Sequence, residues 1–309
     1  MEPSHNCCVC GDPANPKNVL NGRTYCDRHF VQVNKHHLGF WRTGALQILA
    51  MGIFSAVVAL IADSLHDLNQ TALIVFGLFL AIVPTIWWLY FFYREDQIEP
   101  EPKTRVAEVF LLALLLTDTV GLRLVNDVFN IRSWVEINPS ASLLATILIP
   151  GFVFMAIQYF AVRAMVYATE EFDERMDGIV YGTAAGLGVA TLLNLHHIID
   201  NGGVALAPGV IHVVTTALAQ ASFGGLMGYF MSQAKFEHRP VFWVPLGLSI
   251  AAVLNGLFTW VISEVSVSGL TVDPWRSLVF GIVVALATFV VLVALIRRAN
   301  RLTLSPSAG

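Results

Sequence analysis

The sequence predicts an all-α membrane protein of about eight transmembrane helices with a small zinc-finger-like module at its amino terminus. Three observations lead to this prediction: only 13% of the 309 residues are charged, long apolar runs recur along the chain, and all four cysteines precede the first run. A soluble domain carries about a quarter charged residues. We place the module at residues 1–40 and the membrane domain at residues 41–302.

The apolar runs have the length of bilayer-crossing helices. A hydrocarbon core of roughly 30 Å takes about 20 residues of helix. Strands of a membrane barrel would alternate in polarity, and these runs do not. The polar first 43 residues predict no cleaved signal peptide, so the first span would direct insertion. We expect spanning helices at 44–62, 71–93, 106–125, 143–167, 178–199, 208–233, 241–263 and 275–296.

The placement of basic residues predicts the orientation. With the amino terminus inside, 14 of the 18 Lys and Arg residues fall at the cytoplasmic side, while Arg123, Arg132 and Arg276 fall at the other. Because cytoplasmic loops are rich in Lys and Arg, we expect a multi-pass plasma membrane protein with both termini in the cytoplasm. A net charge of −4 without a basic stripe gives no sign of a nucleic-acid partner. The sequence instead predicts the lipid bilayer as the partner of this chain.

Cysteine and histidine spacing predicts a metal site in the amino-terminal module. Cys7 and Cys10 are separated by two residues, and Cys26 and His29 repeat that spacing further along the chain. Short turns of this kind point two ligands at one ion, and tetrahedral zinc takes four nitrogen or sulfur ligands. We therefore assign zinc to these four residues.

The residues between and after the two pairs predict a treble-clef-like fold. Asn21-Gly22 is a strong two-residue hairpin signal, and Cys26 and His29 share one face at the start of a plausible helix. So short a fold cannot bury enough apolar surface, and the metal would supply its folding free energy. Cys8 is left over, His5 is a competing ligand, and reduced thiols without a metal are the alternative.

A few polar residues lie within the expected spans, where such groups are costly and are functional candidates. Helical rise places several of them together in the outer half of the bilayer. Each has a structural alternative: Asn194 and Asn255 can hydrogen-bond between helices, Asp118 can pair with Arg123, and His212 can be a buried histidine. The candidates for lining a membrane cavity are Asp118, Gln158, Asn194, His212 and Asn255.

Two further patterns belong to the fifth and sixth spans. His196, His197 and Asp200 could form a metal trio, although such residues are ordinary at a membrane interface. Small residues at Gly182 and Gly186, and at Gly224, Gly225 and Gly228, predict close contact between neighbouring helices.

One segment of the chain resembles a known family. The run Glu171-Phe-Asp-Glu-Arg-Met-Asp-Gly-Ile-Val-Tyr-Gly182 is similar to the central motif of the PrsW family of intramembrane proteases. The element Glu99-Pro-Glu-Pro102, the histidine His212 and the segment 254–258 resemble other family motifs and follow in the family's order. The resemblance implies metal-assisted cleavage of membrane-anchored proteins.

The chain departs from the family where the resemblance implies catalysis. The family's glutamate pair and lysine fall at Phe154, Met155 and Gln158. The glutamate of its next motif falls at Leu193, and a later histidine falls at Asn255. Because Phe and Leu can neither bind a metal nor act as a base, we predict a PrsW-like protein that has lost catalysis and binds a membrane-embedded protein or peptide.

Two alternatives stay open at this point. One is an active intramembrane peptidase that cleaves a membrane-anchored protein through a different constellation of the polar residues, with or without a metal in the membrane. The other is a small-solute transporter built around the same polar residues, although the sequence shows neither an internal repeat nor a pair of broken helices.

Overall fold

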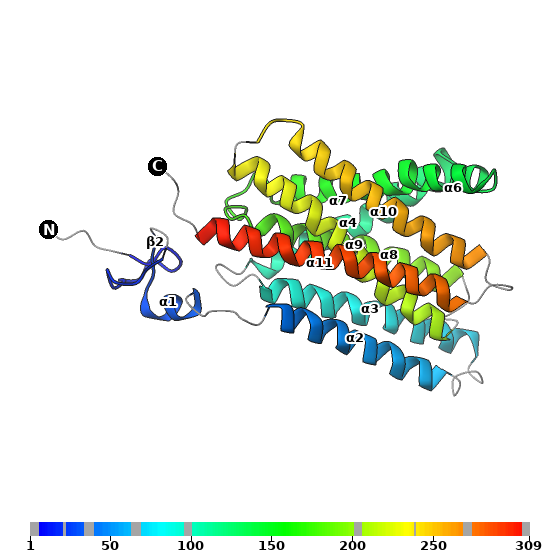
Figure 1. Cartoon of the computed structure of the whole chain (residues 1–309), viewed down its shortest axis with the longest axis horizontal. Helices are drawn as coiled ribbons and strands as arrows, with labels where there is room; N and C mark the ends of the chain where they lie inside the picture. The colour runs from blue at the N-terminus through cyan, green and yellow to red at the C-terminus, as the bar shows by residue number, and fades with distance from the viewer. Residues whose placement is uncertain are drawn as a thin grey trace.

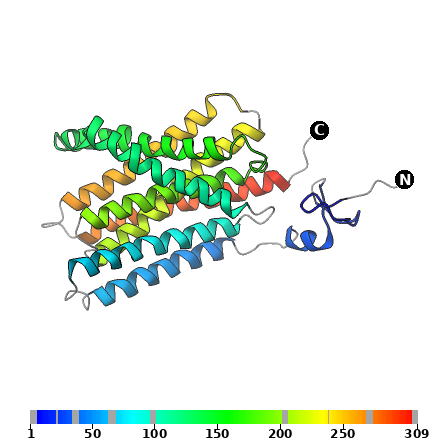
Figure 2. The same ribbon diagram turned by 180° about the vertical axis from the view of Figure 1, so that it is seen from behind.

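The computed structural model describes residues 6–20, 23–33, 40–62, 69–95, 101–200, 206–237, 239–267 and 274–304. Long helices run side by side in one bundle, and a small amino-terminal module lies outside it (Figures 1 and 2). The module consists of β1 (Val19–Leu20), β2 (Arg23–Thr24) and α1 (Asp27–Val33). The bundle consists of α2 (Phe40–Ala62), α3 (Gln70–Glu95), α4 (Lys103–Leu116), η2 (Thr117–Gly121), η3 (Leu124–Val128), α5 (Ile131–Val135), α6 (Pro139–Thr146), η4 (Ile147–Gly151), α7 (Phe152–Met165), α8 (Asp177–Asp200), α9 (Leu206–Phe236), α10 (Trp243–Val267) and α11 (Pro274–Leu304), where η marks a π-helical turn.

The predicted helical class is confirmed, and each of the eight apolar runs falls on one of these helical segments. Within the described residues, four helices are both long and apolar enough to cross a membrane. They are Gln70–Tyr93, Pro139–Met165, Asp177–Asp200 and Trp243–Ile262. The count of eight spans therefore stays a prediction.

The third and fourth apolar runs contain π-helical turns that the sequence analysis did not predict. In the third run, the hydroxyls of Thr117 and Thr119 each donate to the carbonyl oxygen four residues earlier, at 2.7 Å. Such back-bonding often bends a helix. In the fourth run, η4 contains Pro150, which lacks the N–H that a regular helix needs. These local features accompany η2 and η4.

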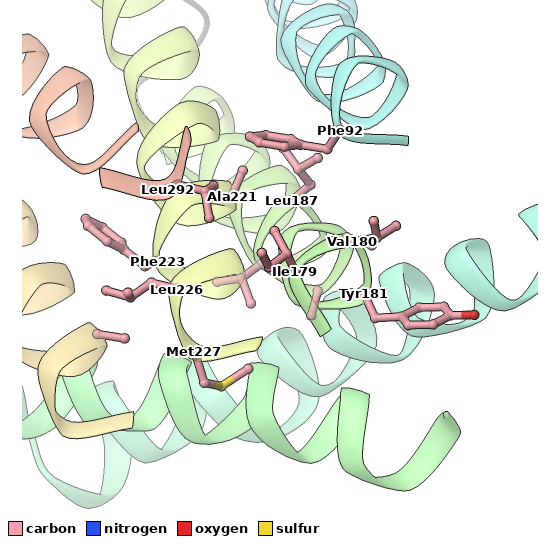
Figure 3. Packing of buried hydrophobic residues seen from close by; sticks show 14 of the residues in the cluster. Phe92, Ile179, Val180, Tyr181, Leu187, Ala221, Phe223, Leu226, Met227 and Leu292 are labelled. Carbon is pink, nitrogen blue, oxygen red and sulfur yellow. The ribbon is translucent and has the colours of Figure 1, made fainter. Parts of the chain in front are cut away.

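Helix α8 lies at the centre of the bundle. Its most apolar window is 83% buried, against 33–44% in the other three candidate spans. Figure 3 shows α8 side chains such as Ile179 and Leu187 packed beside Ala221 and Leu226 of α9, with Phe92 of α3 nearby. Because neighbouring helices cover α8, residues from several of them come into contact with it.

Glycines allow α8 and α9 to approach until their backbones touch. A Cβ atom placed on Gly182 would overlap the carbonyl oxygen of Gly224, and one placed on Gly228 would overlap that of Gly178. A Cβ on Gly186 would overlap the carbonyl oxygen of Gln220. The predicted close contact between these two helices is confirmed, because only residues without a side chain fit at this distance.

Aromatic side chains join α3 to α11 on another side of the bundle. Trp88, Phe91 and Phe92 of α3 surround Phe289 of α11, and the ring centroids of Trp88 and Phe289 lie 5.5 Å apart. All four side chains are almost fully buried. Edge-to-face and tilted pairs at this spacing are favourable, so this cluster helps to hold α3 in place.

Candidate functional site

The amino-terminal module brings Cys7, Cys10, Cys26 and His29 together. One ligand atom from each lies within 4.8 Å of all the others. The Sγ atoms of Cys10 and Cys26 are 3.8 Å apart, and His29 Nδ1 lies 3.2 Å from Cys26 Sγ and 3.5 Å from Cys7 Sγ. Around a tetrahedral zinc, two thiolates would be roughly 3.8 Å apart and a thiolate and an imidazole nitrogen roughly 3.5 Å. The group therefore has the chemistry and spacing to hold a metal ion.

Short-range backbone hydrogen bonds shape the turn that contains Cys7 and Cys10, the first two residues of this group. Cys7 N donates to Asp12 O at 2.7 Å, and Gly11 N donates to Cys7 O at 2.9 Å. Gly11 has a φ of +73°, which favours a residue without a side chain. Hydrogen bonds from the backbone N–H groups of Cys26 and Cys10 lower the pKa of the Cys7 thiol to about 6, against the raising effect of its burial. Although the backbone of Asp12 lowers it, desolvation and hydrogen bonds with the side chains of Asp12, Cys7 and Cys26 raise the pKa of the neighbouring Cys10 thiol. A metal ion would bind both cysteines as thiolates.

The second half of the group follows the predicted hairpin and helix. Val19 pairs with Thr24 across β1 and β2, while the turn residues Asn21-Gly22 lie outside the described residues. Cys26 directly precedes α1, and its carbonyl oxygen accepts from Phe30 N at 2.8 Å. Cys8 is exposed, and His5, the competing ligand, also lies outside the described residues.

A second candidate site is a chain of three amides inside the bundle, which we call the amide centre. Gln158 Nε2 of α7 donates to Gln220 Oε1 of α9 at 3.0 Å, and Gln220 Nε2 donates to Asn255 Oδ1 of α10 at 2.8 Å. None of the three side chains is more than 1% exposed. The sequence analysis singled out Gln158 and Asn255 but missed Gln220, although an amide in the middle of an apolar span is itself a signal.

The other cavity candidates do not join the amide centre. Asn194 Nδ2 donates to the carbonyl oxygen of Val213 at 3.1 Å, which is the interhelical bond that the sequence analysis considered. His212 stacks on His197, with ring centroids 4.0 Å apart. Asn255 of α10 is thus part of the amide centre, whereas Asn194 of α8 and His212 of α9 have other partners. Their convergence in one cavity stays a prediction.

Asp118 has a different partner from the one considered. Its Oδ1 lies 3.4 Å from His196 Nε2, and both side chains are about half exposed. Arg123 makes no ion pair with Asp118 in the described part of the chain. His196 thus turns toward α4 and η2, whereas His197 turns toward α9. Among the described residues, the Cys/His group of the module is the one set of three or more such side chains close enough to share an ion, so the trio with Asp200 does not gather.

Two motifs that carry the family resemblance meet at one end of α8. Tyr181 OH donates to Glu101, so the element before α4 is joined to the central motif. Asp177 Oδ2 accepts from Glu174 N at 2.5 Å, and Gly178 N at the start of α8 donates to Ser232 Oγ at 3.2 Å. The side chains of Tyr181, Glu101 and Asp177 are all buried. The motifs therefore form a structural junction.

Lys235 at the end of α9 fastens the loop before α8. Its Nζ donates to the carbonyl oxygens of Tyr167 and Phe172, at 2.9 and 2.6 Å. It also lies 4.9 Å from the centre of the Phe172 ring, a favourable position for a cation. The loop between α7 and α8 is in this way held against the bundle.

A Tyr181→Phe substitution tests this junction. Removing the hydroxyl takes one hydrogen-bond donor away from the buried Glu101 carboxylate, which we expect to cost about 1–3 kcal/mol of stability. The melting temperature of the detergent-solubilised protein should fall. Tyr159→Phe is the control, because Tyr159 is partly exposed and its hydroxyl makes no hydrogen bond within the described residues. Equal melting temperatures for the two variants would contradict this role of Tyr181.

The positions where the resemblance implies glutamates hold buried apolar side chains. Phe154 and Met155 lie on α7, one turn before Gln158, and are 4% and 0% exposed. Phe154 packs toward Gly121 of η2. Leu193 on α8 is partly buried and packs against the core. The positions where the resemblance implies glutamates are therefore occupied by apolar side chains that pack in the core.

Comparison with known proteins identifies the family. Residues 101–296 match the PrsW family intramembrane metalloproteases. The chain is 30% identical over 192 residues to Protease PrsW of Bacillus subtilis, covering 60% of this chain and 82% of that protein. It is 31% identical over 185 residues to Protease PrsW of Geobacillus kaustophilus, covering 59% and 77%. No solved structure matches the chain. Since the match covers more than half of its length and includes Glu101 and the central motif to which it is joined, this chain belongs to the PrsW family.

Proposed function

We propose that this chain is a PrsW-family membrane protein without proteolytic activity that binds a membrane-embedded protein partner. The amide centre carries the proposal. Metal-assisted hydrolysis needs ligands that hold the ion and a general base that activates water. The amides of Gln158, Gln220 and Asn255 are neutral and cannot take up a proton at ordinary pH. Two hydrogen bonds join them, and Gln158 Oε1 and Asn255 Nδ2 are buried without a hydrogen-bond partner among the described residues.

The surroundings of the amide centre support the same proposal. Phe154 offers no ligand atom, and Met155 offers only a thioether, which is no base. His212 stacks on His197 and makes no contact with the three amides within the described residues. The residues at this centre therefore do not fit the metal that the family's description implies, and we derive no hydrolytic step through it.

The proposal includes the topology and the metal of the module. The positions of the long helices and the alternation of basic residues support eight spans in the plasma membrane, with both termini in the cytoplasm. Three thiols and one imidazole at tetrahedral spacing support zinc in the module formed by residues 1–40. In a family whose members are membrane proteases, an amide centre that offers no general base is suited to binding a membrane segment without cutting it.

A cleavage assay tests the loss of catalysis. Purified full-length protein in detergent is mixed with labelled transmembrane peptides, with Protease PrsW of Bacillus subtilis as the positive control. We expect no product, and we expect His212→Ala and Gln220→Ala to change nothing. Product formation that either substitution abolishes would contradict the proposal.

An active peptidase with a different site is the second candidate. The pair formed by Asp118 and His196 favours it, because a carboxylate beside an imidazole is a common general-base arrangement. In the same assay, cleavage that is lost in His196→Ala but kept in Gln220→Ala would support this candidate.

A further inference from the structure

A lateral groove opens between the α4–η2–η3 segment and the η4–α7 segment. It has a volume of about 510 Å³. Leu116, Val120 and Leu124 form one wall. Val153 and Ala156 belong to the other. All of the side chains that line it are apolar, and the α7 wall belongs to a candidate membrane span, so the groove opens toward lipid. We call it the α4–α7 groove.

The groove is shaped by irregular helix geometry as well as by two helices lying side by side. Val120 belongs to η2, Leu124 to η3 and Leu148 to η4. Turns of π-helix are rare and occur frequently at functional sites, because they interrupt the regular packing surface of a helix. Behind the groove, Ile157 packs toward Gly121 and closes it from the interior. The groove is therefore separate from the amide centre.

The length of the α4–α7 groove fits one leaflet of the bilayer. Eight residues separate Leu116 from Leu124, and twelve separate Leu148 from Phe160. At helical rise these walls measure about 12 and 18 Å, close to half of a hydrocarbon core of roughly 30 Å. A spanning partner helix would need the full thickness, and a helix 18 Å long would occupy on the order of 1,400 Å³ or more.

The composition of the walls also distinguishes the possible occupants. Helices that pack against each other in membranes use small residues, which let the backbones approach. Here the walls are formed by Leu, Val, Ile and Phe side chains, with Ala156 as the one small residue among those that line the groove. No lining side chain offers a hydrogen bond to an unwound peptide. A flexible chain of methylene groups needs neither a flat face nor a polar partner.

Exposed aromatic and apolar side chains follow Phe129, which lines one end of the groove. Phe129 lines it and is 46% exposed, and its carbonyl oxygen accepts from Trp134 Nε1 at 3.1 Å. Trp134 and Ile137 are also exposed. Exposed tryptophans are typical of the membrane interface, where lipid headgroups lie. This end of the groove therefore faces the level at which an acyl chain begins.

We propose that the α4–α7 groove binds one acyl chain of a phospholipid from the leaflet on the side of η3 and α5. The chain lies along Leu124 and Val120 toward Leu116, and its headgroup remains near Trp134. This inference does not depend on whether the amide centre is catalytic.

Photolabelling in vesicles tests the proposal. Full-length protein is reconstituted into phosphatidylethanolamine and phosphatidylglycerol vesicles that contain a phospholipid with a diazirine on its acyl chain. After irradiation, labelled peptides are identified by mass spectrometry. We expect label to concentrate in 116–129 and 148–160. Ala156→Trp should fill the groove and reduce this label several-fold.

Ala287→Trp on α11 is the matched control, because Ala287 is also exposed and lies outside the groove. It should leave the groove label unchanged. Val153→Phe replaces Ala156→Trp if the latter fails to fold, as judged by size-exclusion chromatography. Uniform label over exposed faces, or full groove label in a folded filling variant, would overturn the proposal. So would protection of the groove by an added transmembrane peptide at equimolar ratio.

Discussion

A Cys10→Ser variant of the full-length protein is expected to lose one bound metal ion and the fold of its amino-terminal module. The module has strands of two residues each and one helix of seven residues, which is too little structure to bury a stable core. Structural zinc contributes about 10–16 kcal/mol in modules of this size. Elemental analysis gives the metal count, and amide hydrogen exchange over 6–33 reports the fold.

Cys8→Ser is the matched control for this experiment. Cys8 is adjacent in sequence but exposed and outside the four-ligand group, so this variant should keep its metal and its protection. A wild-type protein without metal would contradict the zinc assignment. An ion that remains in Cys10→Ser would reveal a second metal in the membrane domain and would contradict the proposed loss of catalysis.

A Gly182→Val variant is expected to lose the packing between α8 and α9. The new Cβ would overlap the backbone carbonyl of Gly224, and a backbone cannot move aside as a flexible side chain can. Overpacking a core typically costs about 1–3 kcal/mol, and forcing two central helices apart should exceed that range. We expect little monodisperse protein after detergent extraction.

Gly52→Val provides the comparison for that experiment. Gly52 also lies within a long helix, α2, but a Cβ there meets nothing within 4 Å. This variant should purify and melt like the wild type, which separates the packing effect from any general effect of valine in a helix. A wild-type melting curve for Gly182→Val would show that the two helices can separate without loss of the fold.

The spacing of the Cys and His residues was enough to predict which side chains of the module come together. Cys7, Cys10, Cys26 and His29 could be predicted as one group because their ligand geometry depends on a turn, a hairpin and a helix start, all of which are local. Likewise, Gly182 and Gly224 could be predicted as a helix contact, because a small-residue stripe is a property of each helix separately.

The polar residues of the membrane domain could not be assigned in this way. Depth along a helix placed Asp118, Asn194, His212 and Asn255 at similar levels, but it does not fix the direction in which each side chain points. That direction depends on helix rotation and on the π-helical turns, which change the phase of the residues that follow. As a result, Asp118 faces His196, and Asn255 faces a glutamine that the sequence analysis had passed over.

The sequence alone was enough to predict a helical membrane protein whose amino-terminal Cys and His residues could hold a metal, and its motifs indicated the family. Hydrophobic length, ligand spacing and glycine stripes act over short distances, so they can be read along the chain. The packing of the helices was needed to show that Gln158, Gln220 and Asn255 form one centre and that Glu101 is joined to Tyr181. Those contacts connect residues 35–80 positions apart, and they exist because the packing of whole helices turns the side chains toward one another.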